Sequence, residues 1–349
     1  MPDGTRIEQE GARTLRDAAG LVAAGLVAPG DRAVIEAVAR RYAIAIPAAM
    51  RALISAADDP IGLQFVPDAA ELVTAAHERG DPIGDEALSP VKGIVHRYAD
   101  RALLKPLLTC PVYCRFCFRR EQVGPDGGLL TEAELAAAYV WLAARPAIRE
   151  VILTGGDPLM LSARRLRAIV EALSAIPHLD TIRVHSRVPV ADPGLVTPGL
   201  VAALRTEKAM WLVLHANHAL EFTGAARVAL RLVQGEGVPV LGQSVLLRGV
   251  NDSEAALEAL FRAMLAARVK PYYLHQLDAA PGTARFHVPI AEGRRLLRGL
   301  RGRVTGLAWP TYVLDIPGGF GKVPLGPEYL EADAVRDPGG QSHLLYRPA

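Results

Sequence analysis

The sequence predicts an α/β fold, a partial barrel built from six strand-then-helix units. From about residue 100 onward, short β-rich runs alternate with longer stretches rich in Ala, Leu and Arg. This alternation favours a parallel sheet with helices outside it. Half of the 349 residues are hydrophobic, which is enough for a large core. A complete barrel of this kind has eight units, so an open six-unit barrel fits better, and a doubly wound sheet is the alternative.

Residues 1–95 form the first predicted part of the chain, a helical region. Segments 12–25 and 46–56 carry apolar residues at helical spacing, and Pro and Gly separate them. Strand patterns are scarce in this part. We therefore expect helices in front of the barrel.

The predicted core, residues 96–301, holds the six units. Thr131, with Glu134 three residues later, resembles a capping box at the start of the first helix. The C-terminal segment, residues 302–349, contains one more expected strand near 308–315 and then Pro/Gly-rich chain. The expected strands of the core are 102–108, 150–154, 181–185, 210–215, 238–246 and 270–276. The expected helices are 131–144, 162–175, 194–206, 222–235, 253–268 and 290–301.

Charge and hydropathy argue against several classes of protein. The net charge is +2, so no strong field favours nucleic acid or an acidic membrane surface. No apolar run reaches the roughly 18 residues that a membrane span needs. The first residues lack the basic-then-apolar layout of a secretory signal. The predicted location is therefore the cytoplasm.

Three cysteines, Cys110, Cys114 and Cys117, are the strongest chemical signal. An odd, clustered set argues against a disulfide framework, and thiolates suit iron–sulfur clusters and zinc. Structural zinc normally takes four ligands, and the chain has no fourth cysteine. Three thiolates on a [4Fe–4S] cluster would leave one iron open to a further ligand. Zinc, or three unrelated cysteines, are the alternatives.

Polar residues gather where the predicted strands end. In parallel α/β folds these C-terminal ends carry the active site. The pair Gly155-Gly156 would allow backbone to approach a ligand closely, and Asp157 would accept a hydrogen bond from an ammonium or, alternatively, cap a turn. The other strand-end residues are His185, Ser186, Arg187, His215, Gln243 and Asp278.

Lys322 ends the glycine-rich stretch DIPGGFGKVP, residues 315–324. The stretch is not a P-loop, because Ile316 and Val323 stand where that motif needs Gly and Ser or Thr. Only five of the 39 basic residues are lysines, so a lysine here suggests chemistry that arginine cannot perform. Schiff-base formation with pyridoxal phosphate (PLP) is such chemistry. An exposed basic loop is the alternative.

Seven motifs in order give the chain a family resemblance. They are HRYADR (96–101), CPVYCRFCFRR (110–120), TGGDPLM (154–160), HSRVPV (185–190), QSVLLRGVND (243–252), PYYLHQLD (271–278) and DIPGGFGK (315–322). Together they resemble the lysine 2,3-aminomutase family, from roughly residue 45 to 327. The resemblance implies a radical S-adenosylmethionine (SAM) barrel and an isomerase that uses a [4Fe–4S] cluster, SAM and PLP. It also implies an amino acid substrate and an external electron donor.

The same resemblance assigns cofactor contacts. Cys110, Cys114 and Cys117 would hold the cluster, which reduces SAM to a 5′-deoxyadenosyl radical, and Lys322 would bind PLP covalently. The residues implied to contact the PLP phosphate and ring are Arg97, Tyr98 and Arg101. The residues implied to line the SAM pocket are Gly155, Gly156, Asp157, His185 and Gln243. For the PLP set the alternative is a charged loop before a strand. For the SAM set the alternative is a structural role at the strand ends.

Three charged residues are implied to select the substrate. Arg119 would pair with its carboxylate, since a planar guanidinium suits two oxygens. Asp278 and Asp315 match the positions that bind the side-chain ammonium in lysine-specific members. Two close carboxylates repel until a cation arrives, and the same pair would reject a glutamate side chain. A turn cap at Asp278 and a loop acid at Asp315 are the alternatives.

The predicted reaction is the transfer of the α-amino group of L-lysine to the β-carbon. Chain length and the motifs CRFCFRR and HSRVPV lie nearest the short branch, which makes (R)-β-lysine for attachment to elongation factor P. All three cysteines lie in one motif, so no structural zinc is expected; a homo-oligomer is left open. The alternatives are an aminomutase for another amino acid, a radical SAM enzyme without PLP, and an iron–sulfur switch protein.

Overall fold

One curved sheet forms the centre of the computed structural model, which describes residues 13–331 and 334–344. Within these residues nine strands follow one another in the sheet in chain order, from β1 to β9. Strands β2 to β8 run parallel, and β1 and β9 pair antiparallel with their neighbours. The strands are β1 (Ile94–Tyr98), β2 (Arg101–Leu107), β3 (Glu150–Gly155), β4 (Thr181–Ser186), β5 (Ala209–His215), β6 (Val240–Val245), β7 (Lys270–His275), β8 (Thr311–Asp315) and β9 (Lys322–Gly326).

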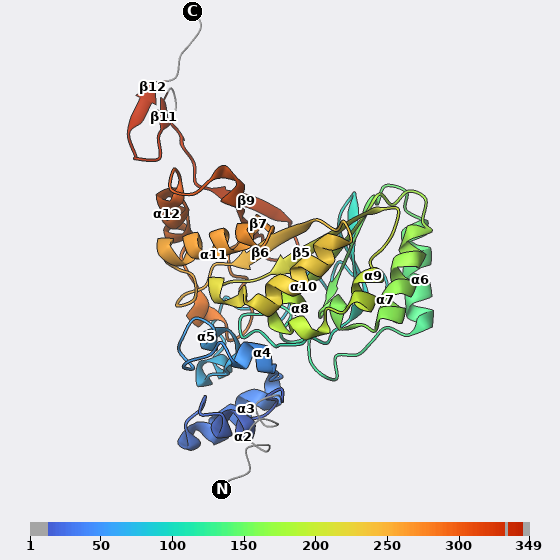
Figure 1. Ribbon diagram of the computed structural model, residues 1–349, viewed down its shortest axis with the longest axis horizontal. Coiled ribbons are helices and arrows are strands. Elements are labelled where there is room, and N and C mark those ends of the chain that lie inside the picture. Colours follow the sequence, from blue (N-terminus) through green and yellow to red (C-terminus); the bar gives the residue numbers. More distant parts are fainter. Residues whose placement is uncertain (1–12, 332–333, 345–349) are drawn as a thin grey trace, which may run out of the picture.

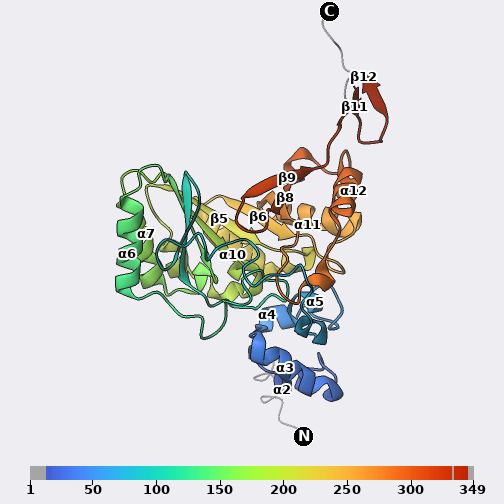
Figure 2. The same cartoon turned by 180° about the vertical axis from the view of Figure 1, so that it is seen from behind.

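A helix follows each strand from β2 to β7, so the predicted six-unit partial barrel is confirmed. The sheet stays open, because β1 and β9 are its two edges. Figures 1 and 2 show the two faces of this arrangement, with α7 and α10 in front of the strands in Figure 1. The helices are α6 (Glu132–Ala143), α7 (Ala163–Ser174), α9 (Pro198–Ala202), α10 (Gly224–Gly235), α11 (Glu254–Ala266) and α12 (Ile290–Leu300).

Local sequence explains where these helices begin and which side they bury. The predicted capping box of α6 is present, with Thr131 and Glu134 bonding each other's backbone N–H groups. Helix α7 starts at the Ser162 cap. It buries an apolar stripe at helical spacing against the sheet, which makes it part of the main core. That stripe is Leu166, Ile169, Val170 and Leu173.

The predicted N-terminal helical region is present, although its helices are shorter than the expected segments 12–25 and 46–56. Its helices are α2 (Ala18–Ala23), α3 (Arg32–Arg41), α4 (Ala48–Arg51) and α5 (Gly62–Phe65). They pack a second apolar core. This core includes Val112, which lies between the first two cysteines, so the helical region supports the cysteine motif directly.

Two parts of the sequence prediction differ from the structure. The helix expected at 194–206 is only α9, after a short 3-10 turn at Pro193–Leu195. Pro193 and Pro198 lack the N–H that a continuous helix needs, so each one starts a new turn instead. Strands β1 and β9 were also missed, and Pro324 is tolerated in β9 because that strand is at the sheet edge.

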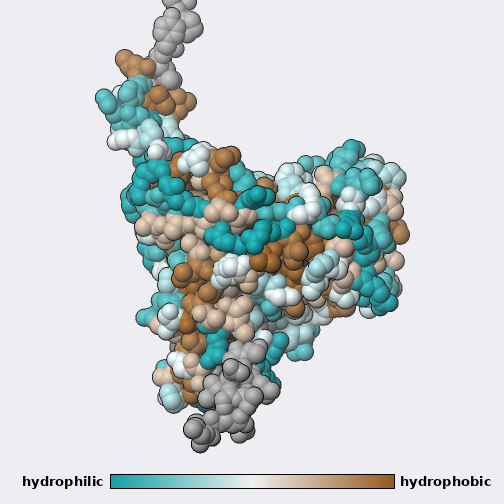
Figure 3. All heavy atoms as spheres, in the orientation of Figure 1, coloured by the Kyte–Doolittle hydropathy of each residue, from teal (hydrophilic) through white to brown (hydrophobic). Residues whose placement is uncertain are grey.

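A small antiparallel sheet, β10 (Leu330–Glu331), β11 (Ala334–Arg336) and β12 (Ser342–Leu344), projects from the body at the C-terminal end. The space-filling view shows hydrophilic and hydrophobic residues on it (Figure 3). None of the helices in the described ranges has the length and hydropathy to cross a membrane. The expected division of the chain at residues 95 and 301 stays a prediction; β8 and β9, beyond 301, continue the main sheet.

Candidate active site

The C-terminal ends of the parallel strands surround a cavity of about 550 Å³. All the site residues singled out from the sequence line it. They are Arg97, Tyr98, Arg101, Cys110, Cys114, Cys117, Arg119, Gly155, Gly156, Asp157, His185, Gln243, Asp278, Asp315 and Lys322. The structure therefore brings these residues together, and their individual roles stay predictions.

The backbone at the end of β3 holds the cysteine loop, residues 109–119. Gly155 has a φ of +107°, which favours glycine. A side-chain carbon on Gly156 would lie only 2.3 Å from the carbonyl oxygen of Thr109. The N–H of Asp157 donates to that same oxygen at 2.9 Å. The close approach that the two glycines permit is thus to the chain's own backbone, just before the first cysteine.

The Asp157 carboxylate is occupied by backbone N–H groups. Oδ1 accepts from Leu159 at 3.1 Å, and Oδ2 accepts from Arg187 at 2.6 Å and Val188 at 3.1 Å. These are capping contacts, and a turn cap was the alternative role that the sequence left open for Asp157. They tie the end of β3 to the short helix α8 (Val188–Ala191). The expected contact between Asp157 and a ligand ammonium stays a prediction.

A buried arginine supports the second cysteine from behind. Arg187 donates to the Cys114 sulfur at 3.2 Å, to Gln64 at 2.6 Å and to Glu221 at 2.7 Å. Its guanidinium also lies over the ring of Phe65, 4.7 Å from the ring centre. Because Glu221 is fully buried, this ion pair is enclosed by protein and leaves little freedom to the sulfur.

A second buried network anchors the rest of the cysteine loop. Glu71 is fully buried and accepts hydrogen bonds from Arg115 and Arg120. Arg285 adds a longer ion pair at 3.6 Å. Burial opposes the ionised form of Glu71, but the charge of Arg115 and its neighbours outweighs this and lowers its pKa. The helical region thus supplies a carboxylate that fixes the loop carrying the cysteines.

Lys322 and Asp315 face each other across the hairpin of β8 and β9, where they are cross-strand partners. The Lys322 ammonium bonds Asp315 Oδ2, and Arg97 reaches Oδ1 at 3.2 Å. The Lys322 N–H donates to the Tyr98 hydroxyl at 2.8 Å. The glycines of the intervening turn have positive φ values of 87–95° at Gly318, Gly319 and Gly321. This conformation explains why the stretch before Lys322 is glycine-rich.

Asp278 follows the end of β7, half-buried and near the same charges. Burial and the neighbouring charge of Asp315 raise the pKa of Asp278 to about 7. His275, 3.9 Å from Asp315, behaves in the opposite way, because burial and the charge of Lys322 lower its pKa to about 3. Near neutral pH His275 is therefore uncharged, while roughly half of the Asp278 carboxyls are ionised.

Basic and aromatic groups fill the wall beside Lys322. The Arg101 guanidinium lies 3.7 Å above the centre of the Tyr98 ring. Arg119 donates to the buried carboxylate of Asp85 at 2.8 Å and reaches the Thr154 hydroxyl at 3.4 Å. This wall is therefore rich in positive charge and suits a ligand with anionic groups.

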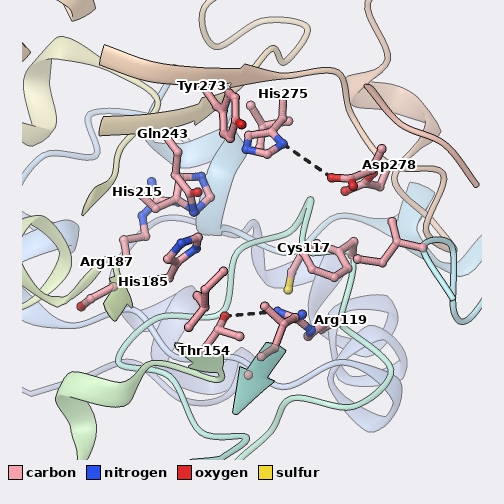
Figure 4. Close-up of a pocket in the computed structure, with 18 of the residues that line it drawn as sticks. Cys117, Arg119, Thr154, His185, Arg187, His215, Gln243, Tyr273, His275 and Asp278 are labelled. Carbon is pink, nitrogen blue, oxygen red and sulfur yellow. Dashed lines mark hydrogen bonds and ion pairs between the residues drawn. The ribbon is translucent and has the colours of Figure 1, made fainter. Parts of the chain in front are cut away.

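The opposite wall carries neutral polar side chains from successive strands. Figure 4 shows His185, His215 and Gln243 on one side of the cavity, with Cys117 and Arg119 on the other. Burial lowers the pKa of both His185 and His215 well below the usual value, so both rings are uncharged. His185 Nε2 is buried and has no hydrogen-bond partner among the described residues. A bound ligand would supply that partner.

Several further residues line the cavity for which the sequence predicted no role. Tyr273 and His275 lie two residues apart on β7, so both point to the same face of the strand. Their alternation within the motif PYYLHQLD was a usable signal. Asp85, which contacts Arg119 from outside the cavity lining, was missed as well, and no local pattern marks it, since its role depends on contacts with distant residues.

Comparisons with known proteins identify the family of the chain. The family model described as "Radical SAM superfamily" matches residues 104–260, and the one described as "Lysine-2,3-aminomutase" matches residues 297–337. An L-lysine 2,3-aminomutase of Acetoanaerobium sticklandii is 40% identical over 78% of this chain and 66% of that protein. A putative L-lysine 2,3-aminomutase of Treponema pallidum is 39% identical over 76% of this chain and 75% of that protein. The chain belongs to the lysine 2,3-aminomutase family.

The predicted lysine 2,3-aminomutase family resemblance is thereby confirmed. The family also includes proteins named for another substrate: a glutamate 2,3-aminomutase of Clostridioides difficile is 34% identical over 78% of this chain and 64% of that protein. The chain also spans just under two thirds of the length of the Acetoanaerobium relative. The substrate therefore has to be argued from the cavity.

The residues present fit the [4Fe–4S] cluster that a radical SAM aminomutase implies. Among the described residues, no three His, Cys, Asp or Glu side chains converge on the position of a single metal ion. A cluster does not need such convergence, because each thiolate binds a different iron. Cys110, Cys114 and Cys117 line one cavity as free thiols, so they would hold three irons of such a cluster and leave the fourth without a cysteine ligand.

The cavity also fits the two organic cofactors of the lysine 2,3-aminomutase family. Arg97 Nε is buried without a hydrogen-bond partner among the described residues, beside Tyr98 and Lys322. A phosphate there would meet two guanidinium groups, those of Arg97 and Arg101. On the other wall, unpartnered His185 Nε2 and the side chain of Gln243 fit the polar groups of SAM.

Proposed function

We propose that this protein is a radical SAM, PLP-dependent isomerase that moves the α-amino group of L-lysine to the β-carbon, giving β-lysine. One observation carries the proposal: the three cysteines, Lys322 and the acid pair Asp278–Asp315 line a single cavity. When bound, the cluster and SAM supply a carbon radical, and PLP holds the amino group while it migrates.

The charges of the cavity support an amino acid bound at both ends. Arg119 is the guanidinium for the substrate carboxylate, because it lines the cavity and is oriented by Asp85. At the other end, Asp315 is 6% exposed and lies near the half-buried Asp278. An ammonium between these two carboxyls relieves their repulsion and stabilises the ionised form of Asp278.

Lys322 and the substrate ammonium use the same carboxylate in turn. With no cofactor attached, the Lys322 ammonium bonds Asp315. If Lys322 bonded the carbonyl carbon of PLP, with the carbonyl oxygen leaving as water, its nitrogen would no longer be a free ammonium held by Asp315. Asp315 would then be available to accept the side-chain ammonium of lysine, so that attachment of the cofactor would prepare the substrate site.

The acid pair also separates lysine from glutamate as substrate. A glutamate side chain would bring a third carboxylate to Asp278 and Asp315, without a partner in a buried site. Apart from Lys322, Arg97 is the cation among the described residues that contacts Asp315, and its contacts with Asp315 and Asp85 already engage it. The geometry therefore supports a cationic amino acid.

The proposal also includes an electron donor, a cellular location and a use for the product. An external electron donor is needed, because the three cysteines of the chain belong to one cluster. We also propose a cytoplasmic protein of the short branch, whose (R)-β-lysine serves elongation factor P, as the motifs CRFCFRR and HSRVPV indicate. Sedimentation analysis would determine whether the protein forms a homo-oligomer.

The proposal is tested by incubating the anaerobically reconstituted protein with SAM, PLP, a reductant and L-lysine. Chiral chromatography should detect β-lysine, and its enantiomer reports the branch. Cys114→Ala and Lys322→Ala should abolish product, while Lys92→Ala, at an exposed lysine, should not. If SAM is cleaved but lysine is inert, a different substrate or a PLP-independent radical enzyme replaces the proposal. A protein that binds the cluster but does not cleave SAM would instead support the alternative function, an iron–sulfur switch protein.

A further inference from the structure

We propose that Asp85 is a positioning residue that holds Arg97 and Arg119 together, and so links the PLP-phosphate subsite to the substrate-carboxylate subsite. The inference rests on the proposed function, which gives these two arginines their ligands. Asp85 itself is not among the residues that line the cavity. It therefore acts through the side chains that it contacts.

The Asp85 carboxylate lies at the centre of three cations. It is 1% exposed. Its Oδ2 is 2.8 Å from Arg119 Nε and 3.9 Å from Lys105 Nζ, while Oδ1 is 3.5 Å from Arg97 Nη2. Burial opposes the ionised form of Asp85, but the charges of Arg119 and Lys105 outweigh it and lower the pKa. Asp85 is therefore an anion that both cavity arginines share.

Arg119 depends on Asp85 more than on any other side chain described. Its other hydrogen bond, from Nη1 to the Thr154 hydroxyl, is long at 3.4 Å. The Phe118 ring lies against the guanidinium at 4.4 Å and restricts its plane without fixing its direction. The short contact from Nε to Asp85 thus sets where the remaining nitrogens point.

Arg97 is held from two sides. Nη2 donates to the Ile83 carbonyl at 2.6 Å, and Nη1 reaches Asp315 at 3.2 Å. The contact with Asp85 comes from the same short segment as Ile83. A shift of this segment would therefore move Arg97 and Arg119 at the same time.

The segment that carries Asp85 is itself packed on the loop before Lys322. A side-chain carbon on Gly84 would lie 2.9 Å from the backbone of Gly318, and Gly318 N–H donates to the Pro82 carbonyl at 3.1 Å. Asp81 fixes the segment by accepting from the Asp85 N–H at 2.9 Å. One stretch of backbone thus connects the lysine hairpin to both arginines.

The test uses Asp85→Asn, which keeps the size of the side chain and removes its charge. Two constants are measured: the PLP dissociation constant, from the absorbance of protein titrated with PLP, and the KM for L-lysine in the complete reaction. We expect both to rise by about 10-fold or more, as is typical when a supporting partner is removed. Glu86→Gln, which removes the neighbouring exposed carboxylate, should change neither. Asp85→Glu should recover part of both constants.

A second variant separates positioning from simple charge balance. Asp85→Asn combined with Lys105→Met removes one anion and one cation, so the buried charge count is restored while the guanidiniums still lack their shared partner. If positioning is the role, both constants stay raised in the double variant. Recovery of either constant to its wild-type value overturns the proposal, as does an Asp85→Asn protein with one constant unchanged. Wild-type protein that binds no PLP or makes no β-lysine refutes the proposed function instead.

Discussion

Replacing Asp278 with Asn should remove a pH dependence that this half-buried carboxyl imposes on lysine binding. The pKa of Asp278 is raised from its ordinary value of 3.8 to about 7, first by burial and then by the charge of Asp315. Below pH 7 the group is therefore mostly protonated, and above it mostly anionic. A substrate ammonium binds the anion, so lysine binding should strengthen as the pH rises.

The structure sets the size of the effect. With a pKa of about 7, roughly a tenth of the Asp278 carboxyls are ionised at pH 6 and roughly nine tenths at pH 8. We expect kcat/KM for lysine to rise about tenfold over this interval, because this ratio reports groups of the free enzyme. The three histidines that line the cavity do not interfere: the pKa of His275 is about 3, and those of His185 and His215 are well below the usual value.

The same carboxyl affects stability, with a definite sign. Its pKa is higher in the folded than in the unfolded chain, so it favours folding at low pH, and this contribution is lost as the pH rises through 7. The rise from 3.8 to about 7 corresponds to at most about 4 kcal/mol. Asp278→Asn should therefore unfold at a higher temperature than wild type at pH 8, with little difference at pH 4.

The assay is initial-rate measurement at subsaturating lysine between pH 6 and 8, with thermal unfolding followed in parallel. Asp180→Asn, at an exposed carboxylate that pairs with Arg149, serves as the control. We expect wild type and the control to show the tenfold rise and Asp278→Asn to show a flat, low profile. A flat profile in wild type, or the same rise in Asp278→Asn, would refute the reasoning.

Three further changes test other contacts. Lys322→Arg should keep the ion pair with Asp315 but lose covalent PLP, so borohydride should fix no cofactor to the protein; retained labelling would point to another lysine. Gly156→Ala should lower the iron content of reconstituted protein, because its side-chain carbon would meet the Thr109 carbonyl at 2.3 Å; normal iron content would mean that the loop can relax. Glu71→Gln should reduce the free energy of unfolding in urea by about 3–5 kcal/mol, because buried Arg115 would lose its charged partner; an unchanged midpoint would show that water reaches this pair.

Much of the fold was predictable, because strands and helices of the core carry their own local signals. The buried strands read as short apolar runs, and caps such as Thr131 and Ser162 mark where helices begin. Edge strand β9 gave no such signal, since it contains Pro324 and pairs with β8 alone. Its place in the sheet depends on a hairpin turn rather than on an apolar pattern.

Some site residues carry a local sequence signal, and others do not. Cys110, Cys114 and Cys117 could be found because their spacing alone identifies a ligand set. Asp85 and Glu71 could not, because each is an isolated acid in the sequence whose partners are distant arginines. Gly155 was found for a different reason from the one that the structure shows, since its close neighbour is the chain itself and not a ligand. Local motifs therefore indicate which groups react, and tertiary contacts decide how they are held.

The strand order of the main sheet has a consequence for biosynthesis. Because spatial order repeats chain order from β1 to β9, each new strand can add to an edge that already exists. Chains fold from the N-terminal side while they are being made. The cysteine loop, which follows β2, and its support Glu71 are then in place long before the β8–β9 hairpin emerges. We expect the nascent protein to accept iron and sulfide first and PLP last, because the hairpin that carries Lys322 is the last part of the main sheet to form.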